Sequence, residues 1–161
     1  MEVKKYLYQY HIHIKTARNS LKWSGFEGIK KELIMKSFPE LIKEANDQIN
    51  TVSVEELQSV IDDPNLILVD VQSKDAVEEN GMIKNAIHAN RGFLEFYFDQ
   101  RADNPFKKID LKSDSKIVVY CGAGGQGALA TKTLMDMGFK DVSNLEGGSA
   151  AWVEAGNILY S

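Results

Sequence analysis

The segment that most restricts the fold is KIVVYCGAGGQGALATKTL, which runs from residue 116 to residue 134. Its first five residues are typical of a strand that is covered on both faces, and the residues from 127 onward are typical of a helix. A glycine-rich loop joins the two, and Cys121, the only cysteine of the chain, stands where the strand meets this loop. Open α/β sheets have their functional sites at such strand ends, so the segment predicts both a fold class and a site.

The remaining segments alternate between strand and helix patterns, which favours a parallel α/β sheet with right-handed crossovers. We expect further strands at 65–70 and 85–90, and a strand followed by a turn at 141–148. We expect helices at 35–49, 53–63, 73–80, 91–100, 127–138 and 149–156. The aromatic-rich segment 91–100 is also compatible with a strand, and the helical spacing of its aromatic residues favours the helix.

Local signals fix where several of these helices begin. Two capping boxes, Ser37 with Glu40 and Ser53 with Glu56, are expected to start the first two helices. Ser73 is expected to cap the third, and the glycines that follow the third and fifth helices, Gly81 and Gly138, to end them. The inward faces are predicted to carry Phe38, Leu41, Ile42, Ala45 and Ile49 in the first helix, Phe93, Phe96 and Tyr97 in the fourth, and Leu129, Leu134 and Met137 in the fifth.

Charge and composition divide the chain into two parts. Residues 1–34 hold seven Lys and Arg against three Glu and show no clean hydrophobic period, whereas the rest holds 12 basic against 20 acidic residues. We therefore expect a basic N-terminal extension at 1–34 and one compact domain at 35–161. His11 and His13 would share one face of a strand, but without a third ligand nearby we expect no metal site.

The same composition excludes several classes of function. An acidic main body does not favour nucleic-acid binding, and no run approaches the eighteen apolar residues of a membrane span. We therefore expect neither a membrane nor a nucleic acid as a partner. A single cysteine allows no intrachain disulfide, so we expect a reducing compartment, the cytoplasm.

The glycine loop allows two interpretations. Gly122, Gly124 and Gly127 have the G-x-G-x-x-G spacing of dinucleotide-binding loops, with Glu146 near the position of the ribose-binding acid. However, only 34 residues follow Gly127, which is too few for the second half of a dinucleotide fold. Alternatively, the loop N–H groups and the helix N-terminus give Cys121 a positive potential that favours an exposed, reactive thiolate. We favour the thiolate and expect no cofactor.

With these motifs identified, the chain resembles the single-domain rhodaneses. LVDVQSKDAVEENGMIKNAIHANRG (68–92) resembles the family segment D-V-R-x-x-x-E-x-x-x-G-H-I-x-G-A, and 118–156 resembles its Cys loop, helix and closing G-G-x-x-A-W. The resemblance implies a rhodanese-like α/β fold, with a parallel sheet of about five strands between helices on both faces. It also implies that Cys121 carries a persulfide, without a metal.

Three positions depart from the family pattern. Gln126 stands where the loop commonly has arginine, Gln72 replaces the Arg after Asp70, and Met82 replaces the His of G-H-I. A dianionic donor needs a fixed cation, for which Arg91 is the first candidate and His88 a poorer one. Each has an equally good alternative role: Arg91 in a surface salt bridge, and His88 in a half-buried polar contact. Asp70 is expected to be a turn residue. The expected substrate-binding residues are Gly122, Ala123, Gly124, Gly125, Gln126, Gly127 and Arg91.

The resemblance implies a sulfurtransferase, an enzyme that moves a sulfane sulfur from thiosulfate or a small persulfide through Cys121 to a thiol, to cyanide or to a protein acceptor. The alternative is a rhodanese-like binding or regulatory module with a redox-active Cys121 and little turnover, which the missing loop arginine supports. A dual-specificity phosphatase would need a His before the cysteine and an Arg six residues after it, where this chain has Tyr120 and Gly127.

Overall fold

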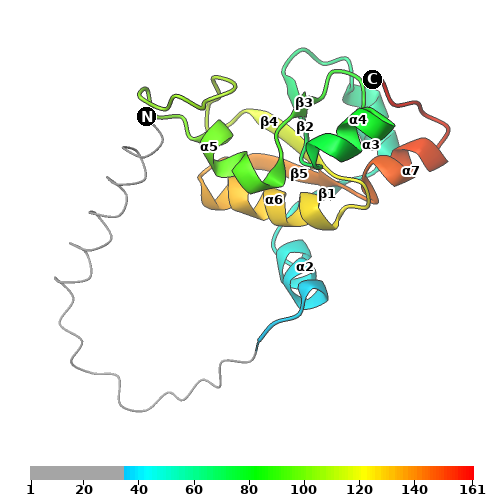
Figure 1. Cartoon of the computed structure of the whole chain (residues 1–161), viewed down its shortest axis with the longest axis horizontal. Coiled ribbons are helices and arrows are strands. Elements are labelled where there is room, and N and C mark those ends of the chain that lie inside the picture. The colour runs from blue at the N-terminus through cyan, green and yellow to red at the C-terminus, as the bar shows by residue number, and fades with distance from the viewer. Residues whose placement is uncertain (1–34) are drawn as a thin grey trace. The chain divides into compact units, whose positions relative to one another are not determined.

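A parallel five-stranded sheet forms the centre of residues 35–161, the part of the chain that the computed structural model describes (Figure 1). The strands are β1 (Asn50–Val52), β2 (Leu66–Asp70), β3 (Ile87–His88), β4 (Lys116–Tyr120) and β5 (Asp141–Leu145). They lie in the order β1-β5-β4-β2-β3, and every pair in register is parallel. The expected α/β class with a parallel sheet of five strands is confirmed.

Helices lie before, between and after the strands. They are α2 (Phe38–Asn46), α3 (Val54–Val60), α4 (Lys74–Asn80), α5 (Leu94–Phe98), which follows a 3-10 turn at Arg91–Phe93, α6 (Gly125–Asp136) and α7 (Gly148–Glu154). Helices α2, α3 and α4 begin where their capping serines predict, whereas α6 begins two residues earlier than predicted. Before α3, the Ser53 hydroxyl accepts the Glu56 N–H and the Glu56 carboxylate accepts the Ser53 N–H, which completes the predicted capping box. The Ser73 hydroxyl caps α4 by accepting the Ala76 N–H, without a carboxylate in return.

The sheet separates two hydrophobic cores. On one face, side chains of the strands pack with those of α5 and α6: Val69, Val71, Leu94, Phe98, Ile117, Val119, Ala130, Leu134 and Val142. On the other face, Leu68, Val118, Tyr120 and Leu145 pack with Val54 and Leu57 of α3 and Trp152 of α7. Strands β2 and β4 contribute alternate residues to both cores, which explains why they are continuous apolar runs.

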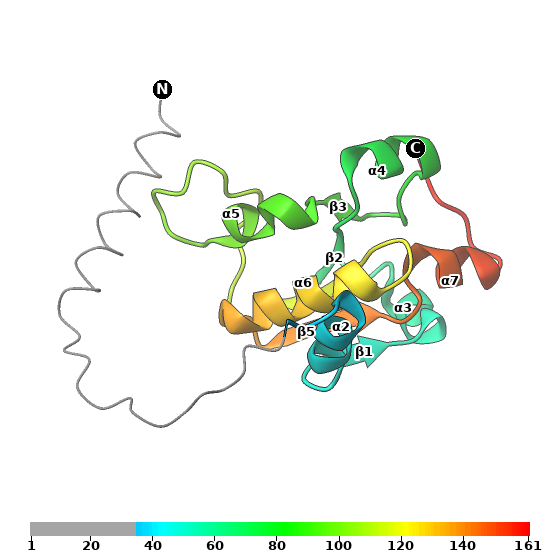
Figure 2. The same cartoon turned by 60° about the horizontal axis from the view of Figure 1, so that its bottom comes forward.

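Helix α2 contributes no side chain to these two cores and packs along α6 (Figure 2). Its Ser37–Glu40 pair is formed, since the Glu40 carboxylate accepts hydrogen bonds from the Ser37 N–H and hydroxyl at 2.6 and 2.7 Å. The helix ends at Asn46, so the predicted continuation to Ile49 is wrong. The chain turns there to enter β1, a strand that the sequence pattern missed because it is only three residues long.

Three residues that were predicted to face inward are exposed instead: Phe38 and Leu41 of α2, and Met137. The two residues of α2 are exposed because this helix lies outside both hydrophobic cores and packs along α6. Met137 is 37% exposed, because α6 ends at Asp136 and the chain turns back at Gly138 with a φ of 102°. The buried face of α6 is instead formed by Gly127, Ala128, Ala130, Thr131 and Leu134.

Two predictions fall outside the described residues: the basic extension at 1–34, and the pair His11 and His13. Residues 36–161 form one compact unit. Within the described part of the chain, no helix combines the length and the hydropathy that crossing a bilayer requires.

Candidate active site

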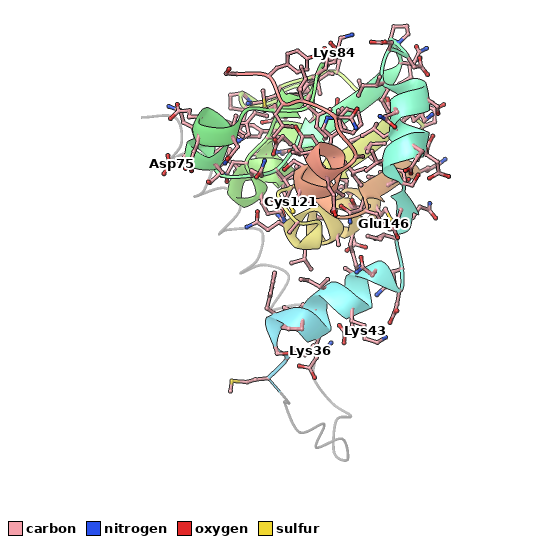
Figure 3. All side chains as sticks on the ribbon, turned by 90° about the vertical axis from the view of Figure 1, so that its right-hand side faces the viewer. Lys36, Lys43, Asp75, Lys84, Cys121 and Glu146 are labelled. Atoms are coloured by element: carbon pink, nitrogen blue, oxygen red, sulfur yellow. The ribbon has the colours of Figure 1, made fainter. Side chains whose placement is uncertain are left out.

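Cys121 follows the central strand β4 at its carboxyl end (Figure 3). The residue is only 4% exposed, so the expectation of an exposed sulfur is wrong: Cys121 belongs to the hydrophobic core that packs against α6. Its Sγ accepts the backbone N–H of Gly127 at 3.3 Å. This N–H belongs to the first turn of α6, where the initial N–H groups have no partner within the helix. The sulfur therefore lies at the positive end of a twelve-residue helix, which favours a negative charge on it.

The loop from 122 to 124 folds tightly before α6. Gly124 has a φ of 87° and serves as the N-cap, a conformation that other L-residues rarely adopt. The next two residues, Gly125 and Gln126, begin the helix and bring two more unpaired N–H donors to the same end. The loop thus presents backbone donors and no charged side chain.

The first residues of α7 donate backbone hydrogen bonds to Cys121 and to the loop that follows it. The Cys121 carbonyl accepts the Ser149 N–H at 2.8 Å, and the Gly122 carbonyl accepts the Ala150 N–H at 2.9 Å. Gly148 has a φ of 62°, and a Cβ atom there would overlap the Cys121 carbonyl oxygen. Gly148 is thereby explained, since only glycine lets this turn approach the loop so closely, whereas a Cβ atom on Gly147, with its φ of 66°, would lie 2.6 Å from Ala151 Cβ.

Asn144 of β5 supports the loop from the sheet. Its side-chain amide donates to the Gly124 carbonyl at 3.3 Å, and its Oδ1 lies so close to Gly127 that a Cβ there would overlap it. Among the described residues, that buried Oδ1 accepts no hydrogen bond. Sequence reasoning missed Asn144 because nothing local links it to a loop twenty residues away.

Cys121 is one of the residues that line a cavity of about 540 Å³. Of the predicted site residues, the cavity lining contains Cys121, Gly122, Ala123, Gly125 and Gln126. The other lining residues, which sequence reasoning did not assign to the site, are Phe38, Ile42, Gln72, Ser73 and Ala76. In the sequence, Phe38 and Ile42 were recognisable only as part of an apolar helix face, and Gln72 only as a departure from the family pattern.

Gln72 reaches the cavity through a turn that follows β2. The buried Asp70 accepts the Gln72 N–H at 2.9 Å and its side-chain amide at 3.2 Å, so Asp70 is a turn residue as predicted. The neighbouring Tyr120 hydroxyl accepts the Ile83 N–H at 2.9 Å. Burial, with the Asp70 charge nearby, raises the pKa of Tyr120 far above its ordinary value, so the phenol stays neutral.

The two cation candidates lie outside the cavity lining. The Arg91 guanidinium donates to the Thr133 hydroxyl at 2.9 Å and to the Glu95 carboxylate at 3.1 Å. His88 is half-buried, and its Nε2 lies 2.9 Å from the Gln72 carbonyl oxygen. These contacts are the salt bridge and the half-buried polar contact that we gave as their alternative roles.

Comparisons with known proteins agree with this geometry. A family model described as rhodanese-like domain matches residues 53–155. A sulfurtransferase of Allochromatium vinosum is 28% identical over 109 residues, which are 67% of this chain and 92% of that protein. The polysulfide-sulfur transferase homodimer of Wolinella succinogenes is 30% identical with a TM-score of 0.60, over 75% of this chain and 85% of that one.

Other similar proteins have different descriptions or greater lengths. A protein of unknown function from Rhodopseudomonas palustris, described as a possible tyrosine phosphatase, is 30% identical with a TM-score of 0.69, over 84% of this chain and all of that one. The chain spans 27% of the Protein HIGH ARSENIC CONTENT 1 of Arabidopsis thaliana and 40% of the tRNA uridine(34) hydroxylase of a Picosynechococcus.

Proposed function

Because the chain belongs to the rhodanese-like domain family, we propose that it is a sulfurtransferase in which Cys121 carries the transferred sulfur as a persulfide. The Cys121 sulfur attacks the outer sulfur of a donor R–S–SH, the donor's S–S bond breaks, and its electron pair and a proton leave with R–SH. The enzyme then holds Cys–S–SH. A thiolate or cyanide attacks the terminal sulfur of this persulfide and restores the cysteine.

The position of Sγ at the start of α6 carries the proposal. The Gly127 N–H that Sγ accepts stabilises a thiolate before attack, and the N–H groups of Gly125 and Gln126 remain available for a negative charge one atom further out. A persulfide anion places its charge on this outer sulfur. The same helix end therefore serves both the nucleophile and the intermediate.

The uncharged cavity limits which donor reacts fastest. Thiosulfate brings two negative charges, and no lining residue carries a positive charge to offset them. A small persulfide brings less concentrated charge to the reacting sulfur. We therefore expect turnover with thiosulfate to be slow and turnover with glutathione persulfide to be faster.

The same observation supports a second candidate, a binding or regulatory module in which Cys121 reacts but turns over slowly. A phosphatase has less support, since phosphate transfer needs a fixed cation in the loop and a base beside the cysteine. Gln126 and Gly127 provide no cation, and Tyr120 is buried and neutral.

Mass measurement of the intact protein separates these candidates. After incubation with glutathione persulfide, the wild-type protein is expected to gain the mass of one sulfur atom, and Cys121→Ala is expected to gain none. Subsequent addition of cyanide should remove the sulfur as thiocyanate over repeated cycles. Sulfur that is gained but not released to cyanide or thiols favours the module, and the absence of any gain refutes the persulfide.

A further inference from the structure

Helix α2 precedes the family domain, which begins at residue 53, yet it forms one wall of the active-site cavity. Phe38 and Ile42 are one helical turn apart and face the start of α6. A Cβ atom on Gly125 would lie 2.8 Å from Ile42 Cδ1 and 3.6 Å from Phe38 Cζ. Both side chains therefore lie against the first residue after the loop N-cap, within the cavity that contains Cys121.

This wall is apolar, and part of it is open to solvent. Phe38 is 56% exposed although it lines a cavity, whereas Ala45 on the same helix is buried. The open part of this ring is apolar area that an apolar group of a ligand can bury, which is favourable by about 25 cal/mol per Å² of area removed from water.

The charged residues of α2 and those just before and after it are paired within the same segment of the chain. Lys36 pairs with Glu44 at 2.6 Å, Lys43 pairs with Asp47 at 2.8 Å, and Glu40 is bound in the capping box. None of them lines the cavity. The cavity thus combines one reactive sulfur with backbone donors on one side and a hydrocarbon surface on the other.

We propose that the physiological sulfur donor is a small molecule whose sulfane sulfur is attached to an apolar alkyl or aryl group, and that this group packs on Phe38 and Ile42. The volume of about 540 Å³ matches small-molecule pockets. The proposal rests on the sulfurtransferase function and adds the class of donor. Helix α2 then determines specificity without taking part in the chemistry.

Organic thiosulfonates test the proposal, because the reacting group can be kept while the attached group changes. In R–SO₂–S⁻, the Cys121 thiol takes the outer sulfur, the S–S bond breaks, and the sulfinate R–SO₂⁻ leaves while the persulfide keeps the proton. We would compare methanethiosulfonate with benzenethiosulfonate. Burial of the phenyl ring against Phe38 should raise the rate constant for persulfide formation about tenfold over the methyl compound.

Variants of α2 test whether Phe38 causes the faster reaction of the phenyl compound. Phe38→Ala should remove most of the phenyl preference, because the rate with the phenyl compound should fall much more than the rate with the methyl compound, and Phe38→Leu should restore part of the preference. Leu41→Ala is the matched control, since Leu41 is 41% exposed on the same helix but does not line the cavity. Equal rates for the two compounds in the wild type, or a phenyl preference that survives Phe38→Ala, overturn the proposal.

A binding measurement keeps this result separate from the sulfurtransferase function. Benzenesulfinate should protect Cys121 from iodoacetamide at lower concentration than methanesulfinate does, and Phe38→Ala should abolish the difference. If no persulfide forms but this difference is present, the sulfurtransferase function fails while the apolar subsite stands. If persulfide forms and the two sulfinates protect equally, only the apolar subsite fails.

Discussion

Replacing Gly127 with alanine separates helix propensity from packing. Gly127 lies in the first turn of α6, where alanine would ordinarily stabilise a helix by up to about 1 kcal/mol. Here the new Cβ would overlap the Asn144 side chain and lie 3.4 Å from Tyr120 Cα. Overpacking a buried site costs about 1–3 kcal/mol, so we expect Gly127→Ala to lower the free energy of unfolding by about 1 kcal/mol net.

Urea unfolding of a double-mutant cycle measures this overlap directly. Asn144→Ala alone should cost about 0.5–1.5 kcal/mol, because it removes the hydrogen bond to the Gly124 carbonyl. In Gly127→Ala/Asn144→Ala the overlap is absent, so the double variant should be at least about 1 kcal/mol more stable than additivity predicts. Gly127→Ala should also slow persulfide formation, because the Gly127 N–H moves from Sγ. Stabilisation by Gly127→Ala, or strict additivity, refutes this reasoning.

Three further predictions concern stability, donor use and the domain boundary. Tyr120→Phe should cost about 1–3 kcal/mol in urea unfolding at neutral pH, because the buried Ile83 N–H loses its acceptor. Folding raises the pKa of Tyr120, so the contribution of its hydroxyl to the free energy of unfolding is complete below the ordinary tyrosine pKa of about 10 and is lost as the pH rises above it. The difference in the free energy of unfolding between wild type and Tyr120→Phe should therefore shrink above about pH 10. Gln126→Arg should raise kcat/KM for thiosulfate about tenfold or more, whereas Arg91→Ala should change it less than about twofold; a larger loss would make Arg91 the cation. A protein limited to residues 35–161 should unfold cooperatively, and loss of that transition would place the boundary elsewhere.

Local signals were sufficient for most of the elements. The apolar runs that became β2 and β4 needed no tertiary information, because both faces of these strands are covered. Capping residues act on backbone groups two or three positions away, so Ser53 and Ser73 were identified correctly. β1 was missed because three residues at the edge of a sheet carry almost no hydrophobic pattern.

The site was predictable only where chain neighbours form it. The strand, the loop and α6 are contiguous, so Cys121 and its glycines could be found together. Phe38 was assigned to a helix face, but the helical period does not tell which other element that face meets. Asn144 likewise comes from β5, which packs beside β4 only in the folded sheet.

The central claim, that Cys121 carries the transferred sulfur, is tested most directly with a donor whose outer sulfur alone is isotopically labelled. The protein would be mixed with labelled glutathione persulfide, freed of excess donor and then given cyanide. We predict that the label first appears on the peptide containing Cys121 and then leaves quantitatively as labelled thiocyanate, at a rate no slower than steady-state turnover. Labelled thiocyanate formed equally fast by Cys121→Ser would contradict the account.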